Sequence, residues 1–211
     1  MSETSTAKKP ASTVGLRDVV FALITADTAP EGDTAGSTTY GDVEKLVGAV
    51  QAEISNNAGD PDIQYGDDGE MDALYPDPDL TLALELADLP PDKAAKLLGH
   101  TIDQHGVMIA KDTDTPPYIA LGFKSIKANG ADRYLWLYKG RAKYKGETFA
   151  TKKGKEITRQ SGKIDINFIK RLSDGAWRAM VDSDTTAFAS KKASFFTAPY
   201  APTYAPASAE T

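Results

Sequence analysis

Residues 117–140 read "PYIALGFKSIKANGADRYLWLYKG", two apolar runs joined at Asn129-Gly130, a dipeptide typical of the turn in an antiparallel hairpin. One face of that hairpin carries Ile119, Leu121, Phe123, Leu135 and Leu137. The opposite face is aromatic and carries Tyr118, Tyr134, Trp136 and Tyr138. A hairpin with one face in water alternates apolar with polar residues. The stretch therefore predicts strands buried on both faces, with a separate cover over the aromatic face.

Three covers fit the aromatic face, and the sequence leaves them open. The first is a helix packed on the sheet within one chain. The second is a neighbouring copy, since Tyr, Trp and Arg are enriched in subunit interfaces. The third is single-stranded nucleic acid, whose bases stack on aromatic rings flanked by Lys and Arg. For the second cover, the candidate interface residues are Tyr118, Tyr134, Trp136, Tyr138 and the C-terminal aromatics Phe195, Phe196, Tyr200 and Tyr204.

Short strands dominate the rest of the chain. Residues 79–89, "DLTLALELADL", alternate Leu with smaller or polar residues and predict a strand. After Pro90-Pro91 the spacing of Ala94, Leu97 and Leu98 predicts one short helix that ends at Gly99. Further strands are expected within residues 14–27, 45–55, 106–112, 163–172 and 175–183. The acidic residues 56–79 are expected to be mostly loop, with a short strand near residues 63–65.

These elements predict a mainly β fold, a two-sheet β-sandwich or barrel with one short flanking α-helix and long loops. We expect three segments: a flexible N-terminal arm over residues 1–13, one β-sandwich domain over 14–190, and an extended arm rich in Ala, Pro and Tyr over 191–211. The start is polar, and no apolar run approaches the ~18 residues of a membrane span, so we expect neither a cleaved signal nor a membrane contact.

Charge is distributed unevenly along a chain whose formal net charge is −6. Residues 56–92 hold eleven acidic residues and no Lys or Arg, whereas residues 124–171 hold fourteen Lys and Arg against four acids. Such a dipolar layout favours pairing with another copy over nucleic-acid binding. The basic candidates for this contact are Lys152, Lys153, Lys155 and Arg159, and assembly through them is expected to be sensitive to salt.

The motifs that suggest chemistry lack the partners that the chemistry needs. "YGDDG" at residues 65–69 matches a polymerase hairpin, but the third aspartate and the surrounding palm are missing. The same acids do not have the spacing of a calcium loop, and His100 and His105 do not have that of a helical zinc pair. The chain has no Cys and no phosphate-binding or nucleophile motif. We therefore predict no catalytic residues, no metal site and no cofactor.

Six stretches in order resemble the major tail protein family of long-tailed, non-contractile bacteriophages. They are "VGLRDVVFALIT", "YGDD", "LTLALELADLPPDKAAKLLGH", the 117–140 hairpin, "ETFATKKGKEITRQSGKIDINFIKR" and "DGAW". The resemblance covers residues 14–182, and it implies a structural virion protein, the major tail tube subunit, and not an enzyme.

The resemblance further implies assembly into stacked rings of six that form a hollow tube for genome delivery. The implied partners are other copies of the chain, a tape-measure protein, a baseplate or distal tail protein and a tail terminator, with phage DNA passing through the lumen without specific binding. The implied location is the virion tail, assembled in the host cytoplasm. Glu85 and Asp165, outward-facing acids on clear strands, are the candidates for the lumen wall. The alternative function is a solitary β-sandwich module that binds single-stranded nucleic acid or, with calcium, carbohydrate.

Overall fold

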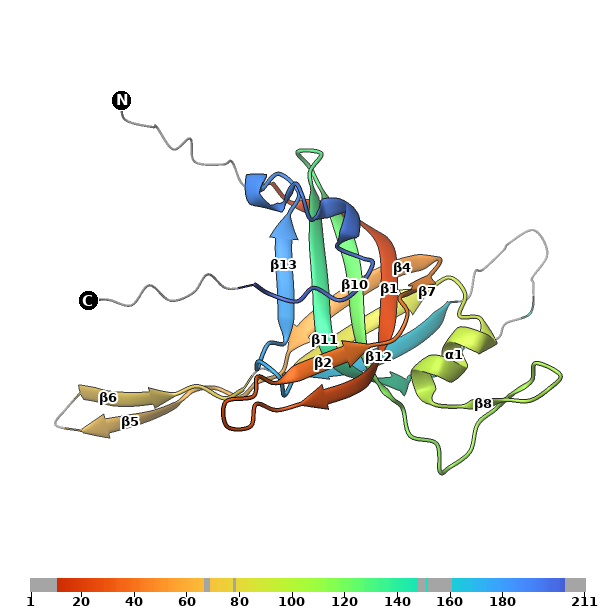
Figure 1. The fold of residues 1–211 in the computed structure, drawn as a ribbon, viewed down its shortest axis with the longest axis horizontal. Helices are drawn as coiled ribbons and strands as arrows, with labels where there is room; N and C mark the ends of the chain where they lie inside the picture. The colour runs from red at the N-terminus through yellow and green to blue at the C-terminus, as the bar shows by residue number, and fades with distance from the viewer. Residues whose placement is uncertain (1–10, 67–68, 78, 148–150, 152–160, 204–211) are drawn as a thin grey trace.

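The computed structural model describes residues 11–66, 69–77, 79–147, 151 and 161–203 (Figure 1). The strands of the described residues are β1 (Thr13–Thr28), β2 (Ser37–Tyr40), β3 (Glu44–Leu46), β4 (Ala49–Asn56), β5 (Asp62–Gly66), β6 (Gly69–Leu74), β7 (Leu80–Leu86), β8 (Thr101–Ile102), β9 (Met108–Ile109), β10 (Tyr118–Lys127), β11 (Asp132–Tyr144), β12 (Gly162–Ile169) and β13 (Arg178–Asp182). One α-helix, α1 (Pro91–Leu98), and two 3-10 turns, η1 (Thr186–Phe188) and η2 (Lys192–Ser194), complete these elements. The chain is mainly β with one short α-helix, which confirms the fold class predicted from the sequence.

Nine strands form one antiparallel sheet that folds over at β11. Its order is β2-β1-β10-β11-β12-β7-β4, with β3 on β1 and β13 on β11. Along one edge of β11, residues 133–137 pair with β13 and residues 139–144 pair with β12. In Figure 1, β10, β11 and β13 run side by side, while β4, β7 and β12 cross them obliquely. The two predicted sheets are therefore two layers of a single sheet, because β11 contributes to both.

The main core lies between these two layers. Every second residue of β7 is a buried Leu. These side chains lie beside the apolar side chains of β12, with Leu82 opposite Ile166 and Leu84 opposite Ile164. They pack against apolar residues of the other layer, among them Phe21 and Leu121. The intervening residues of β7 are partly exposed on the outer face. This alternation is the pattern expected of an antiparallel sheet with one wet face.

The helix α1 closes one end of the core. It starts with Pro91 in its first turn, buries Leu97 and Leu98, and ends at Gly99, whose φ is 77°. A side chain at Gly99 would also place its Cβ 2.4 Å from the carbonyl oxygen of Thr115, so only glycine fits there. Lys93 and Lys96 both donate to the carboxylate of Glu44, which fastens the helix to β3. The predicted helix is confirmed at its expected position.

Three predicted elements differ in detail. The strand expected within residues 45–55 is divided into β3 and β4, because Gly48 has a φ of 84° that interrupts the extended backbone. The acidic segment expected to be mostly loop contains a full hairpin, β5–β6, in place of one short strand. The strand expected within residues 106–112 is only the two-residue β9, which pairs with β8.

Candidate assembly surfaces

A C-terminal cap, defined here as residues 185–200, covers the aromatic face of β10 and β11. Phe188 and Phe195 of the cap are buried against Tyr134, with ring centroids 5.3 and 5.5 Å from the tyrosine ring in edge-on geometry. Phe196 stacks on the same tyrosine at 5.4 Å. Edge-on and offset aromatic pairs of this kind contribute about 0.5–1.5 kcal/mol each beyond the area they bury. The face is thus part of a second apolar cluster within one chain.

Two hydrogen bonds hold the cap to the sheet. The indole N–H of Trp136 donates to the carbonyl oxygen of Phe195 at 2.9 Å, and the hydroxyl of Tyr138 donates to the carbonyl oxygen of Tyr200 at 2.7 Å. Burial raises the pKa of Tyr138 well above its usual range, so its hydroxyl keeps the proton that it donates. The indole ring of Trp136 occupies the space over Gly122, where a Cβ would lie 2.8 Å from the ring. The cover that the sequence left open is therefore the chain's own C-terminal segment.

Buried cations anchor the sheet beneath the cap. The guanidinium of Arg171 lies 3.7 Å from the ring centroid of Tyr138 and donates to the hydroxyl of Tyr40 at 3.1 Å. Lys139 donates to Asp27 at 2.6 Å, and both side chains are only 6% exposed. Burial alone would raise the pKa of Asp27, but hydrogen bonds from Lys139 and the backbone N–H of Leu172 outweigh it and lower that pKa. Arg171 is also paired with Asp174, so each of these buried charges has a partner of opposite sign.

A second ion cluster ties the tip of the β10–β11 hairpin to β13. Asp182 accepts from Arg133 Nε at 2.7 Å and from Lys127 Nζ at 2.6 Å, and the side chain of Lys127 is almost fully buried. The hydrogen bond from Arg133, with that from Lys127, lowers the pKa of Asp182 well below its usual value. This carboxylate is therefore charged at any pH near neutrality and holds β13 to both strands of the hairpin.

The predicted subunit-contact residues fall into three groups. Buried within the chain are Tyr134, Trp136, Tyr138 and Phe195. Partly exposed are Tyr118, Phe196 and Tyr200, of which Tyr118 lies beneath the Lys139 ammonium and the Arg141 guanidinium, 4.8 and 4.1 Å from the ring centroid. Outside the described residues lie Lys152, Lys153, Lys155, Arg159 and Tyr204. A single copy of the chain contains no subunit contact, so their role in assembly stays a prediction.

The two lumen candidates share the outer face of β7 and β12. Glu85 lies 3.6 Å from Lys163 and accepts a hydrogen bond from Ser161, while Asp165 lies 2.9 Å from Lys145. The two acids and their lysine partners line a shallow groove of about 240 Å³ together with Gln51 and Glu53 of β4. Contacts with Ser161, the largest contribution, and with Lys163 lower the pKa of Glu85. The sequence thus placed both acids on one face but did not reveal that each has a lysine partner.

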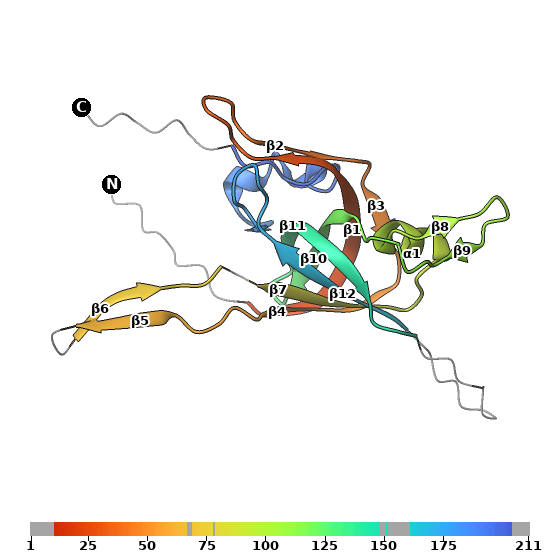
Figure 2. The same ribbon diagram turned by 90° about the horizontal axis from the view of Figure 1, so that it is seen from below.

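Two small hairpins project from opposite ends of the body (Figures 1 and 2). The β5–β6 hairpin extends furthest, and the β8–β9 hairpin lies beyond α1. The sequence analysis missed the first as an element, although Ile63 and Tyr65 alternate with polar residues on one side of a glycine-flanked turn, as do Met71 and Ala73 on the other. Its many acids and prolines concealed that pattern.

No catalytic or metal site is assembled from the motif residues that the structure describes. His100 Nδ1 lies 2.8 Å from Asp114, and His105 lies beside Asp103, so the two histidines have separate partners. Within the described residues, no three His, Asp or Glu side chains are grouped to hold a metal ion. Asp67 and Asp68 of the "YGDDG" stretch lie outside them. In the same part of the chain, no helix is both long and apolar enough to cross a membrane.

The comparison with known families matches the description "Phage tail tube protein" over residues 11–197. No curated protein sequence matches the chain significantly. The family match runs from β1 into the cap, and it includes all thirteen described strands. The chain therefore belongs to the phage tail tube protein family, whose members are structural proteins of the virion tail and not enzymes.

Proposed function

We propose that this chain is the major tail tube subunit of a non-contractile phage tail, and that it assembles into stacked rings of six around a central channel. The observation that carries the proposal is the family match over residues 11–197. It is supported by two hairpins that extend beyond the body.

The sheet offers an edge for ring formation. The sheet order ends at β4, whose Val50 is exposed and whose outer edge has no partner strand in the described part of the chain. An unpaired edge of eight residues is an aggregation hazard in a monomer and a ready contact in an assembly. We assign β4 to the seam between neighbouring copies, where a head-to-tail contact can close into a ring.

The outer face of β4, β7 and β12 is the face we assign to the lumen. Glu85 and Asp165 neutralise Lys163 and Lys145 there, so the face carries little net positive charge. A channel for DNA needs such a wall, since unpaired lysines would bind phosphates and retard the passage. The partly exposed Tyr118, Phe196 and Tyr200 are assigned to contacts between copies, together with the terminal residues 1–13 and 201–211, which lie outside the cap.

The remaining partners follow from the same role. A tape-measure protein would occupy the channel during assembly, a baseplate or distal tail protein would initiate the tube, and a tail terminator would end it. Assembly would take place in the host cytoplasm, and phage DNA would pass without specific binding.

Negative-stain electron microscopy of the purified chain tests the proposal. We expect six-fold rings or tubes that shorten as salt rises, because contacts between the acidic 56–92 and basic 124–171 segments are screened. The matched variant reverses the charges of Lys152, Lys153, Lys155 and Arg159 and should lose tubes at low salt. Monomers at every salt and protein concentration, together with binding of oligonucleotide or sugar, would contradict the proposal and support a solitary binding module.

A further inference from the structure

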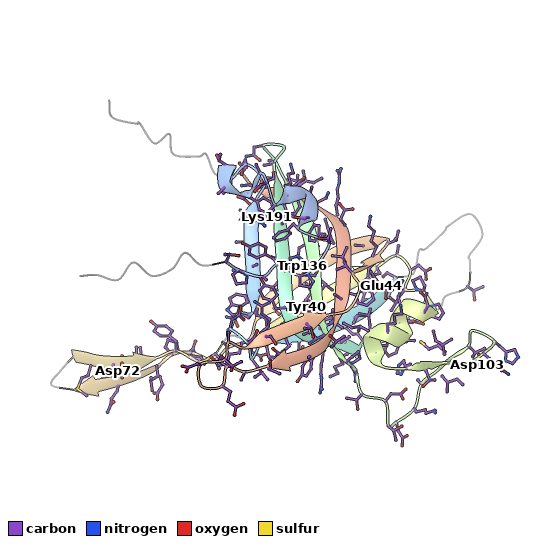
Figure 3. All side chains as sticks on the ribbon, in the orientation of Figure 1. Tyr40, Glu44, Asp72, Asp103, Trp136 and Lys191 are labelled. Atoms are coloured by element: carbon purple, nitrogen blue, oxygen red, sulfur yellow. The ribbon has the colours of Figure 1, made fainter. Side chains whose placement is uncertain are left out.

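The turn at the end of the β10–β11 hairpin is tight and exposed. The backbone N–H of Lys127 donates to the carbonyl oxygen of Ala131 at 2.8 Å, and that of Gly130 donates to the carbonyl oxygen of Lys127 at 2.9 Å. Residues 128–130 are exposed, and Gly130 has a φ of 81°, a backbone conformation that favours glycine. In Figure 3 the turn projects past the labelled Lys191 of the cap. Solvent therefore reaches this turn although most of the hairpin is buried.

The side chain of Asn129 lies along the backbone of the turn. Its carboxamide oxygen accepts a hydrogen bond from the N–H of Ala131 at 3.1 Å. A hydrogen bond to this oxygen stabilises the negative charge that develops on it when a nucleophile attacks the carboxamide carbon. The nearest backbone nucleophile is the nitrogen of Gly130, which would close a five-membered ring with that carbon. A Cβ built on Gly130 would meet no atom within 4 Å, so nothing crowds this side of the turn.

The other three asparagines of the chain lack this combination. Each is followed by a residue with a side chain, which hinders attack by the backbone nitrogen. Asn167 lies within β12 and accepts a hydrogen bond from the hydroxyl of Thr81 at 3.2 Å, while Asn57 donates to the same hydroxyl at 3.0 Å. Asn56 accepts from two backbone N–H groups. Asn129 is thus distinguished by the glycine that follows it in an open turn.

The closed turn slows attack by the nitrogen of Gly130. That nitrogen must lose its proton before it attacks, and in the turn its N–H is bonded to the carbonyl oxygen of Lys127. The exposed end of a hairpin opens locally at a much smaller free-energy cost than the core of a sheet. The reaction therefore requires opening of the turn but not unfolding of the chain.

We propose that Asn129 is a site of spontaneous deamidation, which the folded turn slows. The nitrogen of Gly130, after losing its proton to solvent, forms a bond with the carboxamide carbon of Asn129. The bond from that carbon to the side-chain nitrogen breaks, and the nitrogen takes a proton from water and leaves as ammonia. Water then opens the resulting succinimide at either carbonyl group, which gives aspartate or isoaspartate at position 129.

Both products change the end of the hairpin. Each adds a negative charge to the turn. Isoaspartate also lengthens the backbone of the turn by a carbon atom, which misaligns the hydrogen bond from Lys127 to Ala131 and the one from the N–H of Ala128 to the carbonyl oxygen of Ser12. Because Lys127 also binds Asp182, isoaspartate should loosen the attachment of both β1 and β13 at this end of the sheet.

Incubation of the purified full chain in mildly alkaline buffer tests the proposal. Mass spectrometry of proteolytic peptides measures the conversion of each asparagine to an acid, and enzymatic methylation of the new carboxylate detects isoaspartate. We expect the peptide with Asn129 to convert several-fold faster than the peptides with Asn56, Asn57 and Asn167, with isoaspartate among its products. The matched control, Asn129→Gln, should abolish this conversion, because the longer side chain must close a larger ring.

Two comparisons measure the protection by the turn. The chain unfolded in urea should convert at Asn129 faster than the folded chain. Ala128→Gly, which loosens the turn but keeps the Asn129-Gly130 pair, should convert at an intermediate rate.

The outcomes separate the site from its protection. If Asn129 converts no faster than the other asparagines, or if isoaspartate is absent from its products, the proposed site is overturned. Equal rates in the folded chain, the Ala128→Gly chain and the unfolded chain would overturn the protective role of the turn.

Discussion

The side chain of Trp136 has two structural roles, packing within the sheet and hydrogen bonding to the cap. Its exposed fraction is 0%, its ring fills the space over Gly122, and its indole N–H reaches the cap at Phe195. The same residue therefore packs two strands and orders a segment about sixty positions later in the chain. Loss of such a side chain removes both packing and a satisfied hydrogen bond.

The Trp136→Ala variant should lower the free energy of unfolding of the monomer by about 3–5 kcal/mol, the usual cost of truncating a buried Trp. Trp136→Phe should cost less, because most of the ring volume remains and only the N–H is lost. Urea unfolding of the two variants beside the unchanged chain measures the difference. A Trp136→Ala monomer of unchanged stability that fails only in tube formation would show that the ring serves a neighbouring copy.

Asp182 gives a pH-dependent test at a second residue. The hydrogen bond from Arg133, and after it that from Lys127, holds the folded pKa of Asp182 well below the ordinary aspartate value of 3.8. Its contribution to stability is therefore fully present above about pH 4 and is lost as pH falls through the folded pKa. Asp182→Asn should cost roughly 1–3 kcal/mol at pH 7, the range for a hydrogen bond to a charged partner.

The difference in stability between Asp182→Asn and the unchanged chain should shrink below pH 4. Urea unfolding at pH 7, 5 and 3 measures this difference, because these pH values span the range in which an aspartate titrates. The exposed Asp88→Asn is the control and should stay within about 0.5 kcal/mol throughout. A difference that grows on acidification would mean that Asp182 is not the charged partner of Lys127 and Arg133.

At the scale of elements, the cap decides whether the aromatic face of the sheet is dry. Phe188 and Phe195 are buried where the cap packs on the sheet, and backbone carbonyl oxygens of the cap accept hydrogen bonds from Trp136 and Tyr138. Without the cap, three large rings on β11 would face water as one patch, which promotes association.

A chain that ends at Asp184 should lose about 3–6 kcal/mol of stability, from roughly 1.5–3 kcal/mol for each buried Phe, and should precipitate on heating. The matched chain that ends at Thr203 keeps the whole cap and should unfold at the temperature of the full chain. Thermal unfolding and the soluble fraction measure both. Equal stability of the two truncated chains would show that the cap is not part of the folded unit.

The same elements show what local pattern can predict. The alternation of Leu80–Leu86 specified β7, and the spacing of Ala94, Leu97 and Leu98 specified α1, because each period is a property of neighbouring residues. The aromatic face of the β10–β11 hairpin correctly predicted that a cover exists. The identity of that cover could not be predicted, because it depends on contacts with the cap, which lies far along the chain. The Pro-rich tail gave no periodic signal, so the sequence could not show that residues 195–200 fold back onto the sheet. The break at Gly48 was missed because an apolar pattern does not encode a positive φ.

At the scale of the whole molecule, the charge of the proposed lumen face can be altered without touching the core. Glu85 and Asp165 are partly exposed, and each lies beside a lysine. Replacing both with their amides would leave Lys145 and Lys163 unpaired on every copy. In a ring of copies those charges would be repeated around the channel, where phosphates pass.

Phage tails built from Glu85→Gln with Asp165→Asn should release DNA more slowly at low salt and recover as salt rises. The control, Glu31→Gln with Asp33→Asn, removes the same charge from an exposed loop and should release DNA at the normal rate. The rate of DNA release from purified particles is the measurement. If the two double variants release DNA equally fast, Glu85 and Asp165 do not face the channel.

The strand β11 has partners on both edges along most of its length, first β10 and β13, then β12. Its amides can exchange with deuterated solvent only when one of the two layers separates from it, and such a separation opens the main apolar cluster that lies between the layers. Opening either layer removes support from the other, so the molecule should lose both together in one cooperative event. The backbone amides of β11 should then be the slowest to exchange, at the free energy of global unfolding, while those of the β5–β6 hairpin exchange many orders of magnitude faster in the isolated subunit.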